Sequence, residues 1–262
     1  MNDGSDVRDA ARRVNDSPAT GGLARLGYLA SGVLHVMLGI IAIQVAWFRS
    51  PTAADQSGAF AALARHPVGA LALVVVAVGF AGLAVWNVTE AVGSARGVGD
   101  RAKAASKSVV YGVLAWTAVR FAWGAPSSAE EQSRDFTASL WTHPGGRFAV
   151  AAVGLVVLGV AVYHVHKGWT RTFLQDLVKS PGRFVTAAGR VGYVARGIAL
   201  ALVGGLFVAA GVRARPDQAG GLDTALRRLG EEYSGAFLLT VIAVGLVAYG
   251  VYSFARARWT RT

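Results

Sequence analysis

The 262-residue chain contains no cysteine. This absence excludes disulfide bonds, thiolate metal sites, iron–sulfur clusters and a cysteine nucleophile. Charge is also scarce, because Asp, Glu, Lys and Arg make up 16% of the residues, whereas a soluble domain carries about 25%. The hydrophobic fraction is 53%, so there are too few charged residues to cover the surface of a soluble protein of this size. The composition therefore indicates an integral membrane protein.

Six apolar runs follow a polar segment at residues 1–22, which is expected to be a flexible tail. Each run is close to the ~20 residues that a helix needs to cross a bilayer. The runs are continuous and lack the alternation of transmembrane strands, which predicts an all-α integral membrane fold. They cover about residues 26–47, 67–89, 108–124, 147–166, 191–212 and 235–255, and the third is the shortest.

Basic residues are distributed unevenly among the connecting segments. The N-terminal tail, residues 90–107, residues 167–190 and the C-terminus hold about twice as many Lys and Arg as the loops at 48–66, 125–147 and 213–232. Since Lys and Arg favour the cytoplasmic side, this predicts a multi-pass protein of the cell membrane with cytoplasmic N- and C-termini. The net charge is +11, and the basic residues lie between the apolar runs. This placement indicates contact with anionic lipid headgroups on the cytoplasmic side and no nucleic-acid partner.

The chain contains an internal repeat. Residues 26–33 (LGYLASGV) resemble residues 191–198 (VGYVARGI), and Gly82 aligns with Gly159. The repeat defines three helix-pair units, at residues 23–92, 103–169 and 187–259. Two spans per unit give every unit the same orientation, and such parallel repeats are related by an axis along the membrane normal. The prediction is a six-transmembrane-helix bundle with pseudo-threefold symmetry and either a packed or an open axis.

The three outer loops also resemble one another. Each places apolar residues at i, i+3 or i+4, the spacing of a short amphipathic helix. The segments at 58–63, 135–141 and 222–229 are therefore expected to form such helices and to lie flat at the outer interface.

Motifs at the ends of the units point to a family. Two units open with Gly-Tyr-x-x-x-Gly, at residues 27–32 and 192–197, and two end in the segments at 163–168 (YHVHKG) and 252–258 (YSFARAR). On these motifs the chain resembles uncharacterised bacterial membrane proteins built from three tandem copies of a two-transmembrane-helix domain of unknown function. The second unit departs from the opening, with Lys107 in place of the first glycine. The resemblance implies a topology in the bacterial inner membrane and carries over no activity, cofactor or catalytic residue.

Ionisable side chains inside a bilayer are candidates for function, because they are costly there. His35 lies near the middle of the first run and Arg120 lies in the third, and both break the repeat, so they form a candidate intramembrane polar site. The alternatives are a histidine satisfied by a local hydrogen bond and an arginine whose side chain reaches the outer headgroups. Arg196, about one turn inside its run, is expected to reach the cytoplasmic headgroups in the same way.

A second set of polar residues recurs near the inner ends of the second helices: Asn87, His164 and Ser253. These residues either line a cytoplasmic vestibule or face the headgroups beside an aromatic belt, and the aromatic residues just before them favour the belt. His164 and His166 are two residues apart and point to different sides of a helix, so no metal site is expected.

Most of the patterned residues serve packing or the interface. The leading hypothesis is therefore a non-enzymatic membrane scaffold or accessory protein that binds lipids, a protein partner or another copy of itself, without a cofactor. The alternative is a small-solute or ion transporter or channel, with a pathway along the pseudo-threefold axis past His35 and Arg120. An intramembrane enzyme ranks last, because no set of titratable groups converges at one depth.

Overall fold

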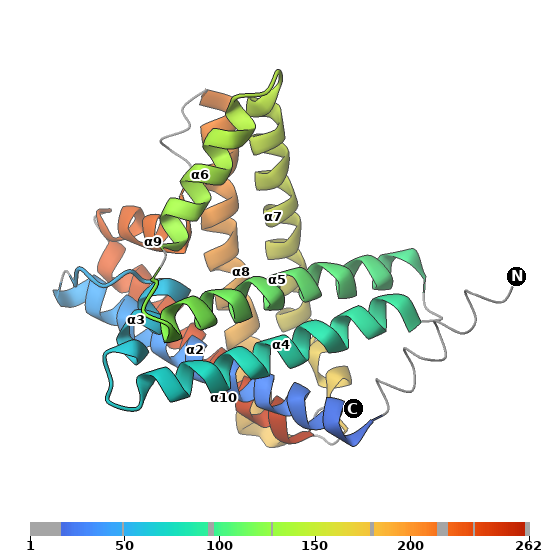
Figure 1. Cartoon of the computed structure of the whole chain (residues 1–262). Helices are drawn as coiled ribbons and strands as arrows, with labels where there is room; N and C mark the ends of the chain where they lie inside the picture. The colour runs from blue at the N-terminus through green and yellow to red at the C-terminus, as the bar shows by residue number, and fades with distance from the viewer. Residues whose placement is uncertain are drawn as a thin grey trace, which may run out of the picture.

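The computed structural model describes residues 17–48, 50–93, 97–126, 128–178, 181–213, 220–232 and 234–259, so most of the predicted tail lies outside the described residues. The regular structure of these residues is helical (Figure 1). The long helices are α2 (Pro18–Phe48), α4 (Gly69–Gly93), α5 (Val98–Ala122), α7 (Gly146–Trp169), α8 (Gly182–Arg213) and α10 (Gly235–Trp259). The short ones are α3 (Gln56–Ala64), α6 (Ala129–Trp141), the 3₁₀ helix η1 (Thr172–Asp176) and α9 (Leu222–Gly230).

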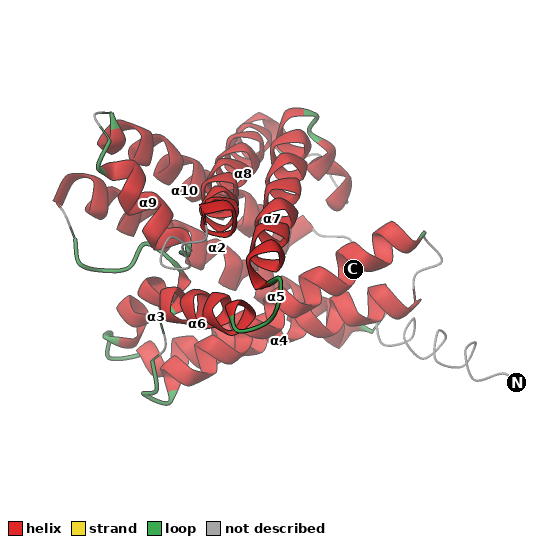
Figure 2. Cartoon of the chain, turned by 90° about the horizontal axis from the view of Figure 1, so that it is seen from above, coloured by secondary structure: helices red, strands yellow, loops and turns green. Residues whose placement is uncertain are grey.

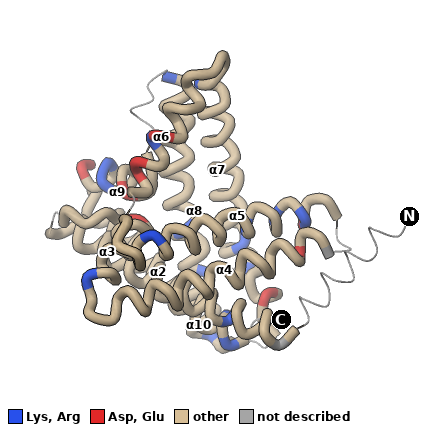
Figure 3. The backbone as a smooth tube through the Cα atoms, viewed as in Figure 1, with Lys and Arg blue, Asp and Glu red and all other residues tan. Residues whose placement is uncertain are grey.

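Five of the described helices are long and apolar enough to cross a bilayer, namely α2, α4, α7, α8 and α10. Large apolar side chains are exposed on them, such as Leu71 and Leu155 at 68% and 61%, which suits helices that face lipid. Figure 3 shows the middles of α4 and α7 free of charge. The chain is therefore a multi-pass membrane protein. The predicted count of six spans is not confirmed, because the first half of α5 carries Asp100, Lys103 and Lys107.

A short helix follows the first long helix of each unit, and the expectation of helices in these loops is confirmed. α3 begins after Asp55, whose carboxylate accepts hydrogen bonds from the backbone N–H groups of Ser57 and Gly58. α6 begins after Ser128, whose hydroxyl accepts from the N–H of Glu131. Both caps satisfy N–H groups that the first turn of a helix leaves unpaired. α9 packs against α6, and its Asp223 accepts a hydrogen bond from the backbone N–H of Ala54 just before α3, so the three short helices lie at one end of the molecule.

The long helices pack in a defined order (Figure 1). The second helix of one unit packs against the first helix of the next, as α4 does on α5 and α7 on α8. α10 packs against α2 and so joins the third unit to the first. Within the units, α2 packs on α4 and α8 on α10, whereas α5 and α7 make almost no contact. The α4–α5 pair runs crosswise to the α7–α8 pair, as Figure 1 and Figure 2 show, and a threefold arrangement is not confirmed.

Glycines explain why the two long helices are in contact in the first and third units and not in the second unit. A Cβ atom on Gly27 of α2 would overlap Leu83 of α4, and one on Gly192 of α8 would lie 2.5 Å from the Cα atom of Tyr249 in α10. These are repeat-equivalent contacts, and small residues at such positions let membrane helices approach closely. In the second unit Lys107 occupies the position of this glycine, and its long side chain prevents the same approach between α5 and α7.

Candidate functional site

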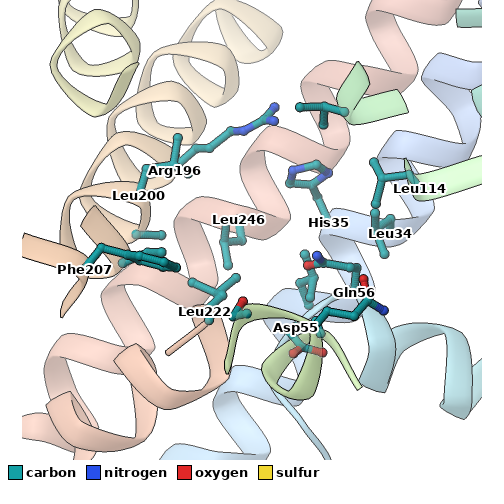
Figure 4. A pocket seen from close by; sticks show the side chains of 18 of the residues that line it. Leu34, His35, Asp55, Gln56, Leu114, Arg196, Leu200, Phe207, Leu222 and Leu246 are labelled. Carbon is teal, nitrogen blue, oxygen red and sulfur yellow. The ribbon is translucent and has the colours of Figure 1, made fainter. Parts of the chain in front are cut away.

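The first helices of all three units, α2, α5 and α8, contribute to the wall of a cavity of about 480 Å³. α10 completes the wall, and residues of α3, α6 and α9 cover one end. Much of the lining is aliphatic or aromatic, as Figure 4 shows: Leu34, Leu114, Leu200, Phe207, Leu222 and Leu246. A concave apolar site with a few polar groups is the usual form of a small-molecule site, and its volume lies in the usual range of about 300–1,000 Å³.

His35 lies on the cavity wall and is 9% exposed. Its Nδ1 atom lies 2.7 Å from the carbonyl oxygen of Ser31, one turn earlier in α2. A ring nitrogen at this distance from a carbonyl donates a hydrogen bond, so the neutral ring keeps Nε2 as an acceptor. The ring centroid lies 4.6 Å from that of Tyr249. The local hydrogen bond predicted as one alternative is therefore present, and His35 also lines a cavity.

Arg196 lines the same cavity from α8 (Figure 4). Its NH1 group donates a 2.6 Å hydrogen bond to the hydroxyl of Tyr249, and its guanidinium lies 4.8 Å from the centroid of that ring. No carboxylate of the described residues forms an ion pair with it. The side chain of Arg196 thus extends from α8 to α10, whereas the sequence analysis predicted that it would reach the cytoplasmic headgroups. Its repeat equivalents, Ser31 and Tyr111, are uncharged, and this break in the repeat was the available signal.

The covered end of the cavity carries two buried carboxylates, Asp55 and Asp223. Burial raises the pKa of Asp55, and its hydrogen bonds from Ser57 and Gly58 only partly offset this effect. Asp223 accepts a 2.7 Å hydrogen bond from the backbone N–H of Ala54 and pairs with Arg227 at 2.9 Å. Arg227 also donates to the carbonyl oxygens of residues 50 and 52. Through these hydrogen bonds, α9 holds the segment between α2 and α3 in place at this end of the cavity.

At the opposite end, η1 packs beneath α8 and α10. Phe173 of η1 is fully buried, with its ring stacked on Tyr193 at 5.4 Å and edge-on to Tyr252 at 5.1 Å. The hydroxyl of Tyr252 donates a hydrogen bond to the carbonyl oxygen of Phe173. Tyr193 in turn contacts Tyr249, the partner of Arg196, at 5.2 Å. Aromatic and cationic groups therefore connect η1 to the cavity.

Asp176 at the end of η1 holds two cations. It pairs with Lys167 at 2.8 Å and with Arg256 at 3.5 Å. Burial by itself would raise the pKa of Asp176, but the charges of Arg256 and Lys167 outweigh burial and lower it. The pair with Lys167 joins η1 to α7, and the pair with Arg256 joins it to α10.

The other candidate residues lie apart from the cavity. Arg120 is half-buried in α5 and does not line it, so the structure brings His35 together with Arg196 and not with Arg120. Asn87, His164 and Ser253 do not line it either. Each bonds the carbonyl oxygen four residues earlier in its own helix, at 2.7, 2.8 and 2.9 Å. Each of the three side chains therefore makes one hydrogen bond within its own helix.

Comparisons with known proteins agree with the repeat. A family model described as Domain of Unknown Function (DUF1206) matches residues 26–93, 102–171 and 191–260. The chain belongs to this family. It is also similar to a protein of Bacillus subtilis (strain 168) named Uncharacterized protein YxxB, with 28% identity over 244 residues and 88% of each chain covered. No solved structure matches the chain. The expected resemblance to proteins with three tandem copies of a domain of unknown function is thus confirmed.

Proposed function

We propose that this member of the DUF1206 family is a non-enzymatic lipid-binding protein of the bacterial cell membrane, whose cavity holds an anionic amphiphile. We place six spans in the bilayer, with both termini in the cytoplasm. The apolar second half of α5 supports the sixth span, and the excess of Lys and Arg in alternate connecting segments supports the orientation. The presence of α2, α5 and α8 around one cavity supports a pseudo-threefold axis through it.

The observation that carries the proposal is Arg196 in the wall of an apolar cavity, without a carboxylate partner among the described residues. A charge inside a membrane protein is costly unless an opposite charge or several hydrogen bonds compensate it. The hydroxyl of Tyr249 supplies one such bond and leaves four of the five guanidinium N–H groups for other acceptors. The aliphatic wall suits a hydrocarbon chain, and Arg196 with His35 suits its anionic end.

The test uses the purified full-length protein with a single-chain anion, oleate, and its neutral analogue, oleyl alcohol. Oleate should raise the unfolding temperature of the wild type more than the alcohol does. Arg196→Gln should weaken oleate binding at least about tenfold, as expected for loss of a hydrogen-bonded ion pair. Arg120→Gln is the matched control, because it removes the same charge from a half-buried arginine outside the cavity. Equal oleate binding by the wild type and Arg196→Gln would contradict the proposal.

Transport of a small solute or ion is the second candidate. It is favoured by the polar pair His35 and Arg196 on a cavity whose wall comes from all three units. Because the chain lacks cysteine, single cysteines can be introduced at His35 or Leu114 and treated with a membrane-impermeant maleimide. Labelling of these positions in intact cells would show a water-filled path and place transport first. Labelling restricted to cysteines in the outer loops would favour lipid binding.

A further inference from the structure

The face of α5 that should meet α7 carries two lysines. The repeat places Lys103 and Lys107 at the positions of Leu23 and Gly27 in the first unit. Gly27 packs directly against α4, and Leu23 contacts Gly82 of that helix. In the second unit the corresponding helices are apart, and we call the space between α5 and α7 the open seam.

The α7 side of the open seam is apolar, and none of the residues that the structure describes covers it. Val156 is 67% exposed and Val160 is 42% exposed, although their equivalents in the first unit, Gly79 and Leu83, lie in a helix contact. A Cβ atom on Gly159 would meet no atom within 4 Å. The seam therefore offers hydrocarbon-facing surface over about two turns of α7.

Cations gather at one end of the open seam. The ammonium group of Lys103 lies 5.6 Å from the centroid of the Tyr163 ring, which places this lysine beside α7. Its ion pair with Asp100 is exposed, and exposed pairs contribute little. Lys107 has no hydrogen bond or ion pair to the rest of the described chain. Lys107 is exposed, and the charges of Arg256 and Lys167 act on its ammonium group.

Asp176, whose charge acts on Lys107, does not balance the charge of that lysine. It is already shared between Lys167 and Arg256, so Lys107 adds a further positive charge near a cluster that has one carboxylate and two cations. Positive charge at the edge of an apolar groove between helices is complementary to a phospholipid, which carries an anionic headgroup above its chains.

We propose that the open seam binds an anionic phospholipid, with its phosphate at Lys103 and Lys107 and its acyl chains between α5 and α7. The orientation that we proposed above puts this headgroup in the cytoplasmic leaflet. The seam is distinct from the cavity site at Arg196, although α5 supplies Val110 and Leu114 to the cavity from the same helix. The lipid completes a helix contact that the other two units make with glycine.

The test compares phosphatidylglycerol with phosphatidylcholine of the same chains, titrated into the purified full-length protein and counted by native mass spectrometry. The wild type should prefer phosphatidylglycerol. The double variant Lys103→Gln with Lys107→Gln should bind phosphatidylglycerol at least about tenfold more weakly, since each basic residue near the headgroups contributes to binding. Its binding of phosphatidylcholine should not change. The matched control, Arg183→Gln with Arg258→Gln, removes two exposed charges outside the seam and should change either affinity less than about twofold.

Two further variants separate the site from loss of folding. Lys103→Arg with Lys107→Arg keeps both charges and should retain phosphatidylglycerol binding. Gly159→Leu fills empty space in the seam and should weaken the binding of both lipids without removing a charge. Equal losses in the glutamine variant and its control would overturn the proposal, and so would unchanged binding in both. Oleate binding reports on the cavity at Arg196. If the glutamine double variant loses phosphatidylglycerol binding and keeps oleate binding, the seam and the cavity are separate sites.

Discussion

The equivalent glycines Gly82 and Gly159 allow a sharp test of the packing. A Cβ atom on Gly82 would lie 2.5 Å from the Cβ atom of Leu23 and 3.2 Å from its carbonyl carbon and oxygen. Such overpacking costs about 1–3 kcal/mol, and the exchange of glycine for alanine in a helix returns about 0.5–1 kcal/mol. Gly82→Ala should therefore lower the free energy of unfolding by about 1 kcal/mol, within a range of about 0–2.5 kcal/mol, whereas Gly159→Ala, whose Cβ atom meets no described atom, should not lower it.

The measurement is the apparent unfolding temperature of both purified variants in the same detergent, read from the fraction that remains monodisperse after heating. For a chain of this size, about 1 kcal/mol corresponds to a decrease of about 2–4 °C for Gly82→Ala. Gly159→Ala should match the wild type or exceed it. An equal decrease in both variants would refute the reasoning, because it would mean that α5 and α7 pack as closely as α2 and α4.

Two predictions concern buried acids. The raised pKa of Asp55 means that its contribution to stability is present below its ordinary value of ~3.9 and is lost as pH rises through the folded-state pKa. Asp55→Asn keeps the helix cap, so it should equal or exceed the wild type in unfolding temperature at pH 7; a lower value would contradict this. The lowered pKa of Asp176 has the opposite sign, with a contribution that is present above ~3.9 and is lost as pH falls through the folded-state pKa. Asp176→Asn should cost about 1.5–3 kcal/mol at pH 7, and the deficit should shrink below pH 4; a deficit independent of pH would exclude the ion pairs as its cause.

The sequence was sufficient for the helical class, the repeat and the short helices between the long ones, because hydropathy and periodicity are local properties. It was not sufficient for the relation between α5 and α7. The departure at Lys107 was visible in the sequence, but its consequence depends on how close the equivalent Gly27 and Gly192 come to their partner helices. That closeness is a property of packing, which the spacing of residues along one helix does not report.

The candidate site shows the same limit. His35 was identified because its position is polar in one unit only, and it does line the cavity. Arg196 also breaks the repeat, since its position is charged in one unit only, yet its place near the end of an apolar run favoured the headgroups. The ring of Tyr249, from a helix about fifty residues later, is what holds its guanidinium between helices. A partner so distant in the chain leaves no signal in the local pattern.

The contact between α10 and α2 has a consequence for the order of synthesis. α2 is synthesised before α10, and α4, α5, α7 and α8 are made between these two packing partners. At about 5–20 residues per second, α2 stays in the membrane for on the order of 10–40 s before α10 exists. During that time its glycine-bearing surface at Gly39, which later meets Ala243 and Val247, has only lipid or another protein beside it. The contact that joins the third unit to the first therefore forms only after the helices between them have been made.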